Sequence, residues 1–216
     1  MSNIDLMGKQ IYELIYKHCD SKGHLIDDYE EVLYCEDKYI SSDRVEELKL
    51  LLNPVSNAKE SLIPLEAAKL LAAWGAPEAI DYFEYCIDNR IDKLGNLSPH
   101  RLYGYDTVYE EISDAIINYY ARHADRSVED GKGASIYIRP LLKKIIQLTK
   151  ELPYSLLGII KILKRKEWRE YESDLKDCFV EFVNKSESGT INDQNIHDLK
   201  ALLMEWDPDF VNKIKV

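Results

Sequence analysis

Cysteine is scarce in this chain, and its spacing excludes several kinds of site. The four cysteines, Cys19, Cys35, Cys86 and Cys178, lie far apart and form no CxxC pair of the kind that zinc and redox sites use. We therefore expect small, buried, reduced residues and no bound metal. On a helix, His18 and Cys19 would point roughly 100° apart, so this adjacent pair is not expected to share an ion.

Long apolar runs are absent as well. No stretch approaches the roughly 20 apolar residues of a membrane span, and residues 1–10 lack the basic and then apolar run of a secretion signal. We expect a cytoplasmic protein with no membrane partner. Apolar residues still make up 45% of the 216 residues, which is enough for a hydrophobic core.

Positive charge is in short supply, above all in the first half. The chain has 28 Lys and Arg against 39 Asp and Glu, for a net charge of -11. Residues 1–130 hold 13 basic and 26 acidic side chains (-13), whereas residues 131–216 hold 15 and 13 (+2). Nucleic-acid binding depends on Lys and Arg that neutralise phosphates, so we expect no nucleic-acid partner and favour a basic one. Acidic excess that only keeps the protein soluble is the alternative.

Apolar residues have helical spacing nearly throughout. Within residues 63–74 they fall at i, i+4, i+7, i+8 and i+11, and the same series recurs 45 residues later in residues 108–119. No comparable alternation of period two, bounded by hairpin turns, is present, so a sheet is not expected. The sequence predicts an all-α protein.

The predicted helices fall into antiparallel pairs, at intervals typical of an α-solenoid. The pairs are 61–74 with 77–90, 107–124 with 134–150, 153–166 with 167–185, and 191–206 with 208–215. The run EAAKLLAAWGAPEAIDYFEYCID, residues 66–88, resembles a HEAT-like repeat, with Gly75-Ala76-Pro77 as its turn. We expect one domain over residues 1–216, with N-terminal helices in 1–60 and helix-pair repeats in 61–216. A compact irregular bundle is the alternative, and residues 186–195 are expected to form a loop.

The predicted helix 77–90 has one apolar face and one acidic face. Asp81, Glu84, Tyr85 and Asp88 share the acidic face at i, i+3, i+4 and i+7. Three carboxylates around a tyrosine can accept Lys or Arg side chains of a partner. A solvated helix face with no partner is the alternative.

The long connection that follows this helix, residues 92–106, is expected to extend the same binding surface. It contains Tyr103, Tyr105 and Asp106, and Glu110 lies in the first turn of the next helix. Connections are usually about 4 to 6 residues long, and longer ones are often binding elements. A packed loop whose tyrosines cover the core is the alternative.

The most acidic segment, residues 27–37, is a second candidate patch. It contains two tyrosines and no Lys or Arg, so repulsion between its carboxylates should cost stability unless a basic partner or solvent screens it. Its spacing does not match a calcium loop. The acidic residues of this patch are Asp27, Asp28, Glu30, Glu31, Glu36 and Asp37.

Catalytic motifs are lacking. The sequence contains no GxxxxGK[ST], GxGxxG, HExxH or GxSxG. Neither His100 nor His123 has an evident nucleophile that it could activate as a general base. His123 is also favourable at the C-terminal end of a helix, where the helix dipole is negative. Basic residues cluster in 161–169, where cations suit helix carbonyl ends better than they indicate a nucleic-acid site. We expect neither an enzyme nor a cofactor.

Residues 66–106, EAAKLLAAWGAPEAIDYFEYCIDNRIDKLGNLSPHRLYGYD, and the Tyr-Glu-Glu run at 109–111 carry a resemblance. With the acidic, all-helical character of the chain, they resemble an immunity protein of a bacterial contact-dependent growth inhibition or related polymorphic toxin system. The resemblance implies a one-to-one complex with a cognate toxin domain, commonly a basic nuclease, whose active site is blocked; we favour a monomer in the free state. It assigns no individual contact residue. A helical-repeat scaffold or adaptor is the alternative, and a helical enzyme acting on nucleic acid is the third and least favoured.

Overall fold

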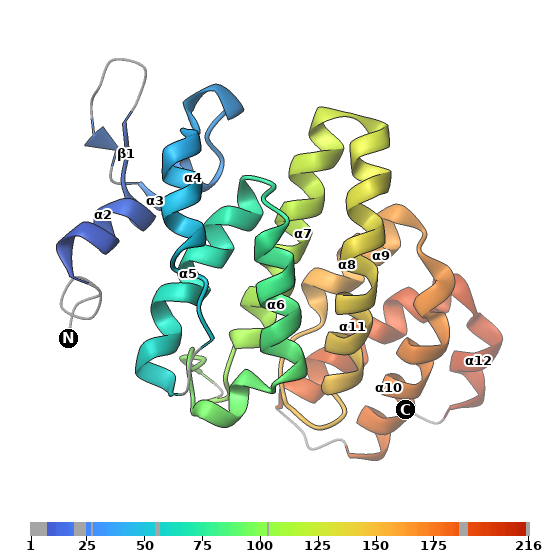
Figure 1. Ribbon diagram of the computed structural model, residues 1–216. Helices are drawn as coiled ribbons and strands as arrows, with labels where there is room; N and C mark the ends of the chain where they lie inside the picture. Colours follow the sequence, from blue (N-terminus) through green and yellow to red (C-terminus); the bar gives the residue numbers. More distant parts are fainter. Residues whose placement is uncertain are drawn as a thin grey trace. The chain divides into compact units, whose positions relative to one another are not determined.

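The computed structural model describes residues 8–19, 25–26, 28–54, 57–102, 104–185 and 190–214, and Figure 1 shows their course. This part of the chain consists mainly of α-helices, which confirms the all-α prediction. The helices of the first half are α2 (Lys9–Tyr16), α3 (Tyr29–Leu33), α4 (Ser42–Lys49), α5 (Ala58–Ala73) and α6 (Glu78–Asp88). Those of the second half are α7 (Val108–Arg126), α8 (Val128–Leu148), α9 (Leu157–Lys166), α10 (Glu172–Asn184), α11 (Ile191–Trp206) and α12 (Pro208–Lys213).

Short elements interrupt the helical pattern. Three single turns of 3₁₀-helix are η1 (Asp37–Tyr39), η2 (Ile91–Leu94) and η3 (Arg169–Tyr171). Two-residue strands, β1 (His18–Cys19) and β2 (Leu25–Ile26), pair antiparallel with His18 opposite Ile26. The expectation that His18 and Cys19 lie on a helix is therefore wrong, because their backbone pairs with a later segment.

The chain divides into two compact units. Unit 1 consists of Met1–Leu97 and Asn118–Ile138, and unit 2 of Ser98–Ile117 and Arg139–Val216. Helices α7 and α8 are each divided between the two units, with about one half of each helix in each unit.

In unit 1, α5 and α6 form the expected helix pair. Gly75 adopts a left-handed conformation with φ 82° and ends α5, and Pro77 precedes the first residue of α6. Small buried residues in α5, among them Ala67, Ala68 and Ala72, allow close packing. The apolar stripe predicted in residues 63–74 thus faces the core of unit 1.

The N-terminal segment is held to this pair through Trp74. Its indole Nε1 donates a hydrogen bond of 3.0 Å to the carbonyl oxygen of Val32, and the guanidinium of Arg44 lies 4.9 Å from its ring centroid. Arg44 also donates to the carbonyl oxygen of Leu14, so one side chain links α4 with α2. Ser41 caps α4 by accepting a hydrogen bond from the amide of Arg44, a role for which serine is among the preferred residues.

Unit 1 also contains the hairpin between α7 and α8. At Gly131 an added Cβ would lie 2.9 Å from the Cα of Ala124, so the two helices approach each other backbone to backbone. Only Gly permits this approach without movement of one helix. In Figure 1 this hairpin is drawn in yellow and yellow-green at the top.

In unit 2, α11 packs against α9, α10 and α12. The buried amide of Asn195 accepts from the amide nitrogen of Leu156 at 2.9 Å and donates to the carbonyl oxygen of Tyr154 at 2.8 Å. α11 begins at Ile191, as predicted for the helix 191–206, so the overlapping loop prediction at 186–195 extends too far. Asn195, expected in that loop, instead satisfies backbone groups of a distant segment inside the unit.

Candidate functional site

The acidic face of α6 lies on the surface of unit 1. Asp81, Glu84 and Asp88 are exposed and Tyr85 is partly exposed, whereas the apolar residues of the opposite face are buried. The side chains therefore divide as the helical spacing predicts. The face can offer three carboxylates to a partner, with a tyrosine between them.

An ion pair with α4 fixes the first turn of α6. The ammonium group of Lys49 lies 2.7 Å from a carboxylate oxygen of Glu78 and 2.9 Å from one of Glu46. Burial is the largest single influence on the pKa of Glu78 and acts to raise it, but the hydrogen bond from Lys49, a backbone hydrogen bond and the charge of Lys49 together lower that pKa. Glu78 thus serves to position α6, whereas Asp81 one turn later stays exposed.

The second candidate patch is partly used within the protein. Asp28 accepts a hydrogen bond of 2.9 Å from the amide of Glu30 and so caps α3, and Glu36 forms an ion pair of 2.8 Å with Lys38. Glu30 and Glu31 are exposed in the first turn of α3, where the helix dipole favours acidic side chains. Asp27 lies outside the described residues.

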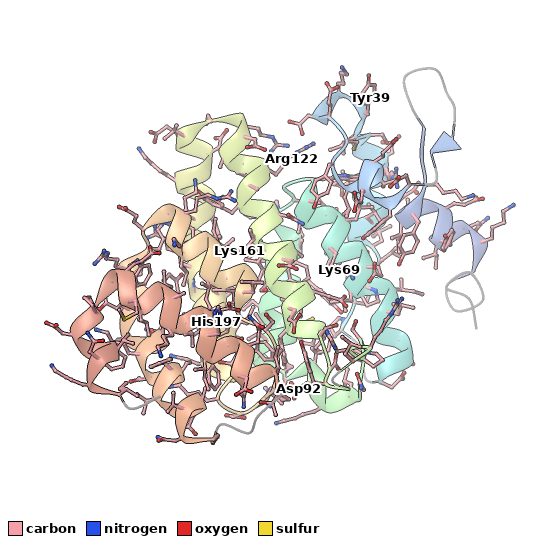
Figure 2. All side chains as sticks on the ribbon, turned by 180° about the vertical axis from the view of Figure 1, so that it is seen from behind. Tyr39, Lys69, Asp92, Arg122, Lys161 and His197 are labelled. Carbon is pink, nitrogen blue, oxygen red and sulfur yellow. The ribbon has the colours of Figure 1, made fainter. Side chains whose placement is uncertain are left out.

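Asp37 has two arginine partners from α7. Its carboxylate lies 2.6 Å from Arg122 Nη2 and 2.8 Å from Arg126 Nη2, and Arg122 also donates to the carbonyl oxygen of Cys35. In Figure 2 the labelled Arg122 lies on α7 toward the segment that carries Tyr39. The hydrogen bond from Arg126 is the largest influence on the pKa of Asp37, which is lowered. The chain thus supplies some of the positive charge that this segment lacks.

A cluster of tyrosines near the N-terminus is not evident from the sequence. The ring centroids of Tyr12 and Tyr16 are 4.9 Å apart, as are those of Tyr16 and Tyr29. The rings contact each other, and the buried carboxylate of Glu66 beside them accepts from Tyr29 and pairs with Lys69. Burial is the largest cause of the raised pKa of Tyr16, and the nearby charge of Glu66 is the next largest. The contacts within this cluster join α2, α3 and α5 to one another.

The connection at 92–106 is tied together by internal contacts. Tyr105 is buried, and its ring stacks on that of His100 at a centroid distance of 4.8 Å. The carboxylate of Asp106 accepts hydrogen bonds of 3.0 Å from the amides of Ser98 and Val108. These contacts favour the packed-loop alternative for Tyr105 and Asp106, while Tyr103 lies outside the described residues.

Glu110 also serves unit 2 internally. Its carboxylate accepts a hydrogen bond of 2.7 Å from the amide of Ser155. Glu110 and the connection at 98–106 belong to unit 2, whereas the acidic face of α6 belongs to unit 1. The residues proposed from the sequence as one binding surface are thus divided between the two units.

The basic residues of 161–169 lie at helix ends in unit 2. Lys164, in the last turn of α9, forms an ion pair with Glu205, and the guanidinium of Arg169 lies 5.6 Å from the ring centroid of Trp206. These contacts agree with the helix-end interpretation of the cluster.

Three exposed apolar side chains on α8, Val128, Ile136 and Tyr137, were missed by the sequence reasoning. Ile136 is 71% exposed and Tyr137 is 61% exposed, although the stripe that begins at Ile138 is buried. The position of these two residues off the i, i+3, i+4 series of that stripe is a signal that could have identified them. They extend the surface of unit 1 beyond its carboxylates.

Neither a metal site nor a membrane span emerges from the described ranges. No group of three or more His, Cys, Asp and Glu side chains there is arranged to hold a metal ion. No helix in that part of the chain has the length and apolar character needed to cross a membrane.

Comparisons of the chain with protein-family models, curated proteins and solved structures find no match. Function is therefore inferred from the residues and their arrangement.

Proposed function

We propose that this chain is an immunity protein that binds a basic toxin domain, such as a nuclease, and blocks its active site. The exposed acidic face of α6 is the observation that carries this proposal, and the net charge of -11 supports it. The resemblance of residues 66–106 points the same way. The protein acts by binding and needs no catalytic group of its own.

Electrostatics explains how such a face would work. A nuclease that binds phosphates presents Lys and Arg around its active site, and carboxylates spaced along a helix resemble that negative substrate. Opposite charges raise the rate of association and reject partners of the wrong sign. Asp81 and Asp88 lie two turns apart on the exposed side of α6, so both can contact one partner surface.

The experiment that tests the proposal is co-expression with a toxin domain encoded beside the gene. Growth should be restored by the chain, and the purified proteins should form a one-to-one complex. Failure to bind or protect against any such domain would refute the immunity function. The same surface would then suit the alternative, a helical adaptor for a basic cellular protein.

A charge-reversal pair tests whether the α6 face is the interface. Asp81→Lys with Asp88→Lys should slow association with the toxin domain about tenfold at low salt, because steering is lost. The matched control is Glu167→Lys with Asp209→Lys, two exposed positions in unit 2. Each reversal adds two charges, so both double variants move the net charge from -11 to -7.

Stopped-flow measurements over a series of salt concentrations separate the outcomes. The α6 variant should associate slowly with a flat salt dependence, and the control should keep most of its rate. Equal slowing in both variants would assign the effect to net charge alone. An unchanged rate in the α6 variant would move the interface elsewhere, first to the exposed carboxylates of Glu30 and Glu31.

A further inference from the structure

An exposed leucine lies at the end of α4. Leu50 is 77% exposed, although Leu48 is fully buried. The backbone at Leu50 is held on both sides. Its amide donates to the carbonyl oxygen of Glu46 at 3.2 Å, and its carbonyl oxygen accepts from the side-chain amide of Asn53 at 2.9 Å. An ordered backbone thus presents an apolar side chain to solvent.

An ion pair joins this end of α4 directly to the first turn of α6. The ammonium group of Lys49 lies 2.9 Å from a carboxylate oxygen of Glu46 and 2.7 Å from one of Glu78. These two oxygens are therefore no more than 5.6 Å apart, which is the sum of the two distances. The side chains of Glu46 and Glu78 keep 70% and 41% of their area exposed. The two helices thus bring carboxylates together at one place on the surface of unit 1.

Leu50 and Asp81 extend this place along the two helices. Leu50 keeps helical dihedral angles and follows Glu46 by one turn on α4, and Asp81 follows Glu78 by one turn on α6. Residues at these spacings are neighbours on a helix surface, with Cβ atoms about 5 to 6 Å apart. Asp81 is exposed and has no ion pair within the part of the chain that the structure describes. These four side chains form a row across α4 and α6, which we call the α4–α6 row.

The α4–α6 row is acidic and has an apolar end. It has three carboxylates, and Lys49 offsets one of their charges. An Arg side chain of a partner can donate to the exposed carboxylates. An apolar side chain beside that Arg would pack on Leu50 and remove apolar area from water. Charge complementarity therefore selects a basic segment, and Leu50 selects one in which apolar residues adjoin the basic ones.

We propose that the α4–α6 row is a docking surface for a basic protein segment, with Leu50 as its apolar anchor and Glu46 and Asp81 as its charge contacts. This inference rests on the proposed function and extends the interface from α6 to α4. Carboxylates alone attract any cation, whereas an apolar anchor beside them discriminates between basic segments. A surface that is ordered before binding also loses less entropy on association.

A defined peptide tests the α4–α6 row even while the natural partner is unidentified. The full chain, labelled with ¹⁵N, is titrated with a 12-residue peptide of alternating Arg and Leu, and amide shifts are mapped. Shifts should concentrate in residues 46–50 and 78–81. Leu50→Ala should weaken peptide binding about fivefold. Val128→Ala is the matched control, because Val128 is also in unit 1 and 73% exposed, and its truncation should leave binding unchanged.

A second matched pair of variants tests the charge contacts. Glu46 pairs with Lys49 at 2.9 Å and Glu129 pairs with Lys132 at 2.9 Å, both with i, i+3 spacing and both in unit 1. Glu46→Gln and Glu129→Gln therefore remove the same charge from equivalent ion pairs. At low salt Glu46→Gln should weaken peptide binding about threefold, and the loss should shrink as salt is added. Glu129→Gln should bind the peptide as the wild type does.

Three results would overturn the proposal. Equal binding of a peptide of alternating Arg and Ser would show that charge alone attracts the peptide. Shifts centred elsewhere, or equal losses in the two members of either matched pair, would remove the docking role from the α4–α6 row. A dimer in sedimentation that Leu50→Glu converts to a monomer would make a second copy of the chain the occupant. Circular dichroism of each variant confirms that it is folded, as expected for exposed positions.

The proposed function and this inference fail in different ways. If the chain protects cells and Leu50→Ala protects them equally well at limiting expression, the docking surface is wrong and the immunity function stands. If no toxin is neutralised but binding of the Arg and Leu peptide still depends on Leu50, the surface stands and the immunity function is wrong.

Discussion

Two glycines of α8, two residues apart, should respond to alanine with opposite signs. At Gly133 an added Cβ would meet nothing within 4 Å, whereas at Gly131 it would lie 2.9 Å from the Cα of Ala124. Both positions are inside the same helix and the same unit, so their intrinsic helix propensities are matched. The contact with α7 is therefore the main difference between them.

The magnitudes follow from these surroundings. Gly→Ala inside a helix is worth about 1 kcal/mol of helix propensity, so Gly133→Ala should raise the free energy of unfolding by up to that amount. Gly131→Ala gains the same propensity, but backbone at 2.9 Å cannot rotate away, and the helices must separate. Overpacking of this kind costs about 1 to 3 kcal/mol. The variants should therefore differ by about 1 to 3 kcal/mol, with Gly133→Ala the more stable.

Urea unfolding followed by far-ultraviolet circular dichroism measures this difference. Equal slopes against urea concentration would show that the change lies in stability rather than in the extent of unfolding. In a chain of this length, 1 kcal/mol corresponds to a shift of about 2 to 4 °C in Tm. Equal stabilisation by both substitutions would refute the close approach of α7 and α8 at Gly131.

Two further predictions concern ionisable groups in unit 1. Asp37→Asn should lower the stability at pH 7 by about 1 kcal/mol, and less in 1 M salt, where surface charges are screened. The folded pKa of Asp37 lies below its unfolded value, so its contribution is present above about pH 4 and is lost as pH falls through the folded pKa. A stability difference from wild type that did not shrink as the pH was lowered below about 4 would contradict the ion pairs. Burial raises the pKa of Cys86 to about 12. Alkylation at pH 8, followed by mass spectrometry, should therefore label the partly exposed Cys35 well before Cys86. Equal labelling of the two cysteines in the native protein would show that Cys86 is accessible.

Features that depend on neighbouring residues could be predicted from the sequence. The division of α6 into a buried and an exposed face follows from the spacing of its apolar residues, and the turn at Gly75 follows from the Gly-Ala-Pro order. The cap at Ser41 is equally local. Such local signals predict which face of a helix is buried, but not which residues pack against that face.

The features that could not be predicted join residues far apart in the chain. Asp37 lies in a segment with no compensating charge of its own, yet its partner Arg126 is 89 residues away. Asn195 has the composition signal of a loop residue, but its amide lies between two backbone groups about 40 residues earlier. Tyr105 illustrates the same limit, because an aromatic residue in a loop has the same composition signal whether it is exposed or buried.

The arginine pair on α7 affects the electric field at the start of α6, because an added Cβ at Gly75 would lie 3.2 Å from Arg126 Nη1. Arg126 acts to lower the pKa of Tyr119, whereas Tyr137 and Asp81 act to raise it. Asp37 offsets one of the two positive charges brought by Arg122 and Arg126. Without Asp37, this end of α7 would add uncompensated positive charge beside the helix whose acidic face is proposed to attract a basic partner. One carboxylate from the N-terminal segment thus helps to preserve the negative local potential through which a basic partner would approach.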